Sequence, residues 1–178
     1  MILFFSFQVL ISYTQTTQPI FNSDFPSSWQ GDWAGELLIF NADGMSKSLP
    51  MQLNIQAVEQ SKNYSFTIVY GVGEEKDTRS YMLKEVDASK GHYLIDEQNS
   101  IKIDAYLLGG KLVQRFEVMG NILETFIEKR GETMVWEIFS GKTNPVHLSG
   151  ETVQDGDEIP LVKSYPMSVY QKAVLSRI

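Results

Sequence analysis

The stretch Ser28-Trp29-Gln30-Gly31-Asp32-Trp33-Ala34-Gly35-Glu36-Leu37 is the best single guide to the fold. It combines two tryptophans with two glycines, and it joins a polar segment to a long series of strand-like runs. Glycine lets another backbone or a ring approach closely, and tryptophan buries a large apolar surface while its N–H needs a partner. We therefore expect a tight turn into a first strand at 36–40, with an indole closing one end of a core.

Short runs of alternating apolar and polar residues follow this stretch as far as Gly141. The clearest is 49–58, in which alternate residues are apolar, as expected for a half-buried strand. Gly109-Gly110 and Gly120-Asn121 are signals for tight hairpins. About nine short strands with evenly spaced turns indicate an all-β sandwich or barrel. Because tight hairpins favour a meander, we predict an antiparallel up-and-down barrel of about 8–10 strands, which has no exposed edges.

The tail of the chain has a different pattern. Asn144-Pro145 interrupts the strands, and an acidic, loop-like segment follows at 151–160. We predict a C-terminal extension over 142–178 with an amphipathic helix at about 166–178, packed on the barrel wall. Docking on a partner protein is the alternative for this helix. The residues at helical spacing are Met167, Tyr170, Val174 and Ile178.

The N-terminal segment carries no charged side chain before Asp24. The run from Ile2 to Ile11 has the length of a signal-peptide core, and small residues follow it. We predict a signal peptide over 1–14, a linker over 15–28 and a β-barrel domain over 29–141, in a secreted or periplasmic protein. The alternative is that the apolar run forms a buried first strand of the domain.

Gly31-Asp32-Trp33 resembles the Gly-x-Trp signature of the lipocalins and the wider calycin group. In that family the tryptophan closes one end of an up-and-down barrel and packs against an arginine near the last strands. The resemblance implies a lipocalin-like barrel closed by Gly31 and Trp33, with Arg130 as the arginine and Arg115 as a second candidate. The chain departs from the family pattern in having no cysteine for the usual bridge. A capping tryptophan in another β fold is the alternative.

Aromatic residues recur along the expected strands. A barrel of about eight to ten strands has room for one small ligand. Aromatic walls with a few tyrosine hydroxyls suit an apolar ligand that has one polar end. The alternative is that these rings simply fill the core. The candidate ligand-binding residues are Tyr64, Phe66, Tyr70, Tyr81, Phe116, Phe126 and Trp136.

Composition and charge argue against several classes of function. The net charge is −7, which argues against nucleic-acid binding and against electrostatic attachment to anionic membranes. The absence of cysteine excludes disulfides, thiol catalysis and cysteine-based zinc sites. Because His92 and His147 are the only histidines, one chain cannot build a three-histidine metal site. No later stretch reaches transmembrane length, and we predict no cofactor and no metal.

Acidic residues on the later strands raise the question of catalysis. Glu117, Glu124, Glu128 and Glu137 are candidates for acid–base work. Cross-strand ion pairs with neighbouring basic residues explain them more simply, so we predict no catalytic residue. The expected function is a secreted, lipocalin-like protein that binds a small hydrophobic ligand in the barrel. The alternatives are a non-enzymatic structural or interaction module of the cell envelope with a filled core, and a barrel enzyme such as an isomerase or a hydrolase.

Overall fold

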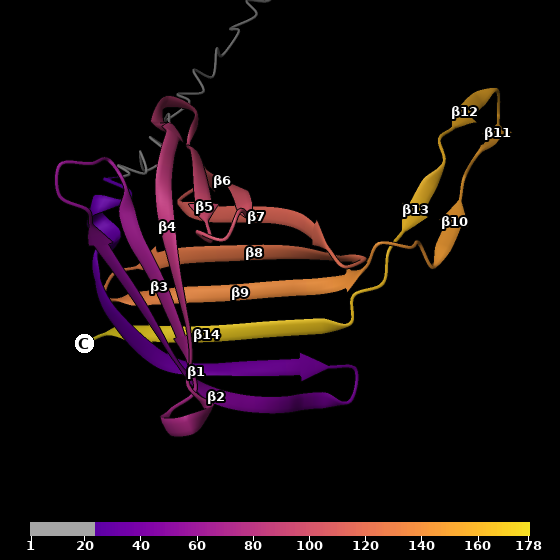
Figure 1. Ribbon diagram of the computed structural model, residues 1–178. Helices are drawn as coiled ribbons and strands as arrows, with labels where there is room; N and C mark the ends of the chain where they lie inside the picture. Colours follow the sequence, from indigo (N-terminus) through magenta and orange to yellow (C-terminus); the bar gives the residue numbers. More distant parts are fainter. Residues whose placement is uncertain (1–23) are drawn as a thin grey trace, which may run out of the picture.

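The computed structural model describes residues 24–178, and its main body is one closed antiparallel barrel (Figure 1). The strands close in the order β1-β14-β9-β8-β7-β6-β5-β4-β3-β2, so every neighbouring pair from β1 to β9 is also consecutive in sequence. This confirms the predicted all-β up-and-down barrel. The barrel strands are β1 Gly31–Asn41, β2 Gly44–Ala57, β3 Tyr64–Tyr70, β4 Asp77–Asp87, β5 His92–Asp96, β6 Lys102–Leu108, β7 Lys111–Val118, β8 Asn121–Arg130, β9 Thr133–Lys142 and β14 Val169–Arg177.

Tight turns enforce this meander. Gly109 and Gly110 join β6 to β7 with φ of 57° and 82°, a pair of left-handed conformations that suits glycine and matches the twist of a hairpin. The turn between β7 and β8 is formed by Met119 and Gly120, one residue earlier than the predicted Gly120-Asn121. Such two-residue turns leave each strand beside its predecessor, so the sheet grows in chain order.

The predicted C-terminal helix is wrong, because this segment is the strand β14. Residues 24–178 contain no α-helix, and their helical turns are the short 3-10 segments η1 Ser27–Trp29, η2 Gly73–Glu75 and η3 Ala88–Lys90. β14 pairs with β1 on one side and with β9 on the other, and it thereby closes the barrel. Ala173 and Leu175 are buried, whereas Val174 between them is half exposed, which is the alternation of a strand.

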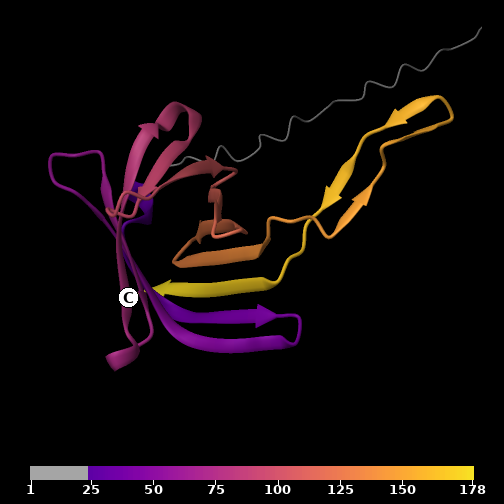
Figure 2. The same cartoon turned by 45° about the vertical axis from the view of Figure 1, so that its right-hand side comes forward.

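Between β9 and β14 the chain leaves the barrel as a long arm (Figure 1, Figure 2). Two short antiparallel pairs build it, β10 with β13 and β11 with β12. Most of its side chains are exposed. The predicted C-terminal extension 142–178 therefore consists of this arm and a barrel strand. The arm strands are β10 His147–Ser149, β11 Thr152–Gln154, β12 Asp157–Ile159 and β13 Val162–Ser164.

One end of the barrel is closed by aromatic side chains. Trp33 is fully buried, and its Nε1–H donates a hydrogen bond to the carbonyl oxygen of Trp29 at 3.1 Å. Phe25 packs edge-on against Trp29 and Tyr93, with ring centroids 4.7 and 4.8 Å apart. Phe25 belongs to the expected linker, so the described part of that segment, 24–28, helps to close this end of the barrel. The predicted signal peptide lies outside the described residues.

The arginine that packs on the closing tryptophan is Arg177 of β14. Its guanidinium carbon lies 4.3 Å from the centre of the Trp33 ring, and its Nη1 donates to the carbonyl oxygen of Gln30 at 2.7 Å. Arg130 instead pairs with Glu128 at 2.6 Å with its side chain largely exposed. The residue that packs on Trp33 is therefore Arg177 and not the expected Arg130. The second candidate, Arg115, is also exposed and pairs with Glu124.

Candidate functional site

The barrel contains a cavity of about 530 Å³. Side chains from β3 to β9 line it, together with residues of the loop between β5 and β6. Because successive residues of a strand face opposite sides, the lining follows a period of two, as in Phe66, Ile68 and Tyr70 of β3. The barrel is therefore hollow over part of its interior, and its lumen is the candidate site.

Most of the cavity wall is apolar. Phe66 and Trp136 are both almost completely buried, and their ring centroids are 6.1 Å apart, a distance typical of packed aromatic pairs. Branched aliphatic side chains line the same cavity. A wall of this kind suits the hydrophobic body of a ligand. The apolar lining residues are Phe66, Ile68, Ile95, Ile101, Ile103, Phe116, Val118, Leu123, Trp136 and Ile138.

A few polar side chains interrupt this wall. Gln114 of β7 and Thr125 of β8 are buried, line the cavity and oppose each other in the strand register. Thr125 in turn opposes Ile138, which lies two residues beyond Trp136 on the same face of β9. The Nε1–H of Trp136 is buried and has no hydrogen-bond partner in the part of the chain that the structure describes. The lumen thus offers polar groups at buried positions.

Ionisable side chains lie at the ends of the lining strands. The Arg79 guanidinium lies 5.6 Å from the centre of the Tyr70 ring, and its Nε is 3.1 Å from a carboxylate oxygen of Asp77. Burial raises the pKa of Tyr70 to about 12. Burial also raises the pKa of Tyr81. Both phenols are therefore neutral near pH 7, and they offer hydroxyl groups rather than charges to the lumen.

A smaller hollow adjoins this region and shares three of its residues. It measures about 350 Å³ and lies beside the ends of β4 and β5. Arg79, Tyr81 and Glu97 line both spaces. The lumen therefore passes from an apolar interior to a polar border. The residues that line the smaller hollow are Thr78, Arg79, Ser80, Tyr81, Glu97 and Asn99.

The structure brings five of the seven candidate ligand-binding residues together in the lumen, namely Phe66, Tyr70, Tyr81, Phe116 and Trp136. Tyr64 is not among the lining residues; it packs against the core at the other end of β3. Phe126 lies between the buried Thr125 and Ile127, so it faces outward. Its ring packs edge-on against Phe139 with centroids 6.2 Å apart.

Sequence reasoning missed the polar lining residues Arg79, Glu97, Lys102, Gln114 and Thr125. The signal for Gln114 was present, since Leu112 and Phe116, the residues two positions before and after it on the same face of β7, are apolar. A polar residue at such a position is expected to face either a partner or a cavity.

Three of the four candidate acidic residues form ion pairs with basic side chains. Glu124 pairs with Arg115 at 3.3 Å, and Glu137 pairs with Lys172 at 3.6 Å. Glu128 pairs with Arg130, which lowers the pKa of its carboxyl group. Only Glu117 of the four candidate acids is a cavity-lining residue. Glu128 also lies 3.7 Å from the Lys111 ammonium on β7, so each of these three carboxylates has a cross-strand partner.

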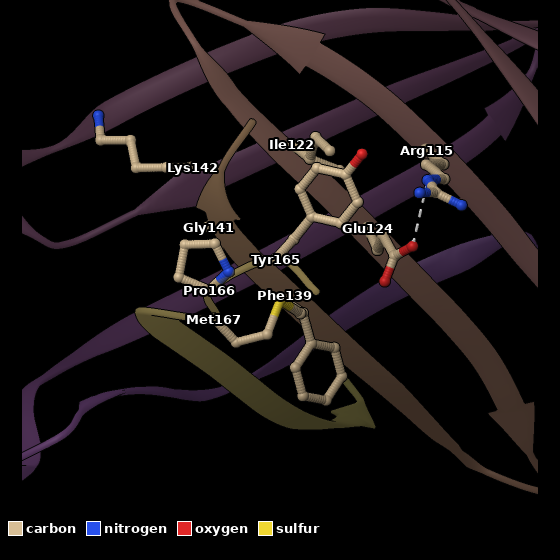
Figure 3. Close-up of a pocket in the computed structure, with 9 residues that line it drawn as sticks. All are labelled: Arg115, Ile122, Glu124, Phe139, Gly141, Lys142, Tyr165, Pro166 and Met167. Atoms are coloured by element: carbon tan, nitrogen blue, oxygen red, sulfur yellow. Dashed lines mark ion pairs between the residues drawn. The ribbon is translucent and has the colours of Figure 1, made fainter. Parts of the chain in front are cut away.

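The outer surface has a hollow of its own where the arm joins the barrel (Figure 3). It measures about 250 Å³, less than half the volume of the lumen cavity. Tyr165, Pro166 and Met167, from the segment that enters β14, form one wall, and the Arg115–Glu124 ion pair forms another (Figure 3). Its size and its salt bridge make it a weaker candidate for a ligand site than the lumen.

Neither a metal cluster nor a membrane-spanning helix is found within 24–178. No group of three or more histidine, aspartate or glutamate side chains in this range is arranged to hold a metal ion. No helix in the same range is long and apolar enough to cross a bilayer.

Comparisons with known proteins identify a fold and no family. No family model matches the sequence, and no curated protein matches it. A DUF3598-family protein of unknown function from Nostoc punctiforme matches with a TM-score of 0.56 and 13% identity. The match covers 85% of this chain and 48% of that protein, so the chain spans about half the length of this neighbour.

An S-type phycobiliprotein lyase from Guillardia theta matches over most of both chains. The TM-score is 0.57 and the identity 9%, with 84% of this chain and 88% of that one covered. At such low identity the two matches carry information on the fold alone. Together with the closed ten-stranded antiparallel barrel, they show that the chain has a calycin-like fold.

Proposed function

We propose that this protein binds a small, largely hydrophobic ligand in the lumen of its barrel. The observation that carries the proposal is the cavity of about 530 Å³ with an apolar wall and a few buried polar groups. Ligand sites in proteins have volumes of roughly 300–1,000 Å³ and the same mixture of apolar walls with a few polar contacts. A filled-core structural module would not need this space.

The distribution of charge favours binding over catalysis. The acidic and basic side chains among the lining residues are Arg79, Glu97, Lys102 and Glu117. All four lie near strand ends or in the loop after β5, while the other lining residues carry no carboxylate, ammonium or guanidinium group. An acid–base enzyme needs titratable groups that converge on one reacting centre. A carrier needs an apolar wall and a polar border, and this arrangement fits that role better.

A dye and ligand titration of the full chain tests this proposal. Trp136 lines the cavity, whereas Trp29 and Trp33 belong to the closed end, so a ligand in the lumen should change the emission of Trp136. The probes are anilinonaphthalene sulfonate, fatty acids and biliverdin. Biliverdin is included because the name of one structural neighbour refers to phycobiliproteins. We expect saturable binding of at least one probe.

Two variants test whether the probe binds in the lumen or on the outer surface of the barrel. Phe116→Asp puts a charge on the cavity wall, and we expect it to weaken binding about tenfold or more, because a buried charge next to an apolar ligand is unfavourable. Phe126→Asp makes the same change on the outer face and is the matched control. Equal affinities for the two variants, or no saturable binding of any probe, would argue for the envelope module instead.

We also propose that the protein is exported, with cleavage near Thr14. The support is the uncharged apolar run at the start of the sequence and the small residues after it. Sequencing the N-terminus of the protein isolated from its own source tests this, and a mature form that retains Met1 would contradict it.

A further inference from the structure

The buried indole N–H of Trp136 is unusual in this barrel. The side chain is only 4% exposed, and its Nε1–H has no hydrogen-bond partner anywhere in residues 24–178. Buried polar groups in native proteins nearly always have a partner, and an unmade hydrogen bond of this kind is unfavourable. Trp33 shows the usual arrangement, since its Nε1–H donates to the carbonyl oxygen of Trp29. The missing acceptor at Trp136 therefore needs an explanation.

The surroundings of Trp136 point to the cavity as the source of that acceptor. Trp136 lines the lumen, and its ring lies 6.1 Å from that of Phe66 on the facing wall. Thr125 on β8, which is next to β9, and Gln114 on β7, the strand after it, are also buried and line the same space. An indole, a hydroxyl and an amide thus lie on one side of the lumen, on three consecutive strands.

We propose that the ligand carries a neutral hydrogen-bond acceptor, such as a ketone, amide or ester carbonyl, within its apolar body and that Trp136 donates to it. This inference rests on the proposed ligand binding in the lumen and names the chemical class of the ligand. A pure hydrocarbon body would leave the indole N–H of Trp136 without an acceptor. A carbonyl oxygen accepts from the indole, and the hydroxyl and the amide can both donate as well.

The acceptor in this position is neutral rather than anionic. The cations that line the cavity are Arg79 and Lys102. Arg79 is paired with Asp77, and its side chain is half exposed, so it lies at the border of the lumen. The neighbours of Trp136 on its own face, Met134 and Ile138, are apolar. A carboxylate held among these side chains would lose its hydration without gaining a counter-ion, which is strongly unfavourable.

Fluorenone and fluorene make a matched pair of probes for this idea. Both are rigid, neutral and aromatic, and they differ only in that a carbonyl replaces a methylene group. Displacement of the bound dye gives the dissociation constant of each. We expect fluorenone to bind about tenfold tighter than fluorene or better, because a site built around a buried donor discriminates against ligands that lack the acceptor.

Trp136→Phe removes the N–H and keeps an aromatic ring on the wall. In this variant the preference for fluorenone should fall to about twofold or less, with fluorene binding little changed. Trp29→Phe removes the indole of another buried tryptophan that lies outside the cavity lining, and it should leave the preference intact. Loss of the preference in both variants alike would contradict a direct hydrogen bond.

A second measurement does not depend on any variant. In a proton–nitrogen correlation spectrum of the full chain, the indole resonance of Trp136 should move downfield with fluorenone and much less with fluorene. If both probes bind with equal affinity and the indole resonance moves equally, the acceptor inference is wrong while ligand binding stands. If neither of these probes nor any other in the panel binds, the proposed function itself fails.

Discussion

Gly31, Trp33 and Arg177 act as one unit at the closed end of the barrel. A Cβ atom at Gly31 would collide with Nη1 of Arg177, and Gly31 has φ of 134°, a conformation that side chains rarely adopt. Glycine is thus required so that the guanidinium can lie over the indole. Arg177 also bonds Glu132 at 2.7 Å, which ties the end of β14 to the turn before β9. The glycine of the Gly-x-Trp triplet is therefore explained by a contact with β14, because it leaves room for Arg177 over the Trp33 ring.

Truncating the closing tryptophan should destabilise the protein strongly. We expect Trp33→Ala to lower the free energy of unfolding by about 3–5 kcal/mol, because a fully buried indole is replaced by a cavity. Urea denaturation followed by circular dichroism measures this change. Truncation of an exposed side chain such as Val146 is the control, with an expected change within about 0.5 kcal/mol. A loss below about 1 kcal/mol for Trp33→Ala would show that the indole does not hold the barrel closed.

Tyr70 should make the protein sensitive to alkaline pH. Its pKa is raised from 10.0 to about 12 by burial. Below pH 10 the phenol is neutral in both the folded and the unfolded chain, so its stabilising effect is complete. As the pH rises from 10 to 12, the unfolded chain releases this proton more readily, and that stability is lost.

The measurement is the free energy of unfolding between pH 8 and pH 12 for the parent and Tyr70→Phe, which cannot ionise. We expect the variant to lose less stability than the parent over the upper part of this range. Tyr165→Phe changes an exposed tyrosine of the arm and is the control. Identical profiles for the parent and Tyr70→Phe would contradict a perturbed Tyr70.

At the scale of elements, β14 shows how one pattern can fit two structures. Tyr170 and Val174 are spaced as on a helix, but they also lie on one side of a strand. In the barrel, that side faces outward, where the Tyr170 ring stacks on Phe139 at 4.7 Å, while Ala173 and Leu175 face the core. Hydrogen bonding to two neighbouring strands decides between the alternatives.

Two alanine variants distinguish the strand from a helix. Leu175→Ala should lower the free energy of unfolding by about 2–5 kcal/mol, because Leu175 is fully buried in the barrel. Val174→Ala should cost less than about 1 kcal/mol, since Val174 is half exposed on the outer face. The amphipathic helix would have placed Val174 in its buried stripe. Equal losses in urea melts of the two variants would therefore contradict the strand.

At the scale of the whole molecule, the barrel and the arm are structurally distinct. The ends of the arm lie close together, because the Ser168 N–H donates to the carbonyl oxygen of Ser140 at 2.9 Å where β14 begins beside β9. No residue of the arm lines the lumen cavity. The barrel should therefore fold and bind its ligand without the arm.

Replacing residues 146–164 with a short Gly-Ser linker tests this separation. We expect the midpoint of thermal unfolding to change by no more than about 4 °C, which corresponds to roughly 1 kcal/mol for a domain of this size. The dye affinity should stay within about twofold of the parent value. A non-cooperative unfolding transition in this variant would show instead that the arm is part of the barrel's stability.

A structural feature of this protein could be predicted from the sequence when it depends on residues that are close together in the chain. The strand at 49–58 and the hairpin at Gly109-Gly110 are local, because alternation and backbone freedom are properties of neighbouring residues. Phe126 was assigned to the lumen because apolar residues occupy both faces of β8, so its alternation does not say which face is inside. The arginine on Trp33 was missed because that contact joins the two ends of the barrel domain.

The sequence by itself determined the all-β class, the meander and the aromatic closure at Trp33, since these follow from side-chain period, turn residues and the cost of exposing an indole. Only the tertiary structure decided that 169–177 is a strand, that Arg177 covers Trp33 and that the lumen is hollow. These three features depend on strand pairing and packing between residues far apart in the chain. A pattern of neighbouring residues does not predict these features, because the contacts that stabilise them form only when the barrel closes.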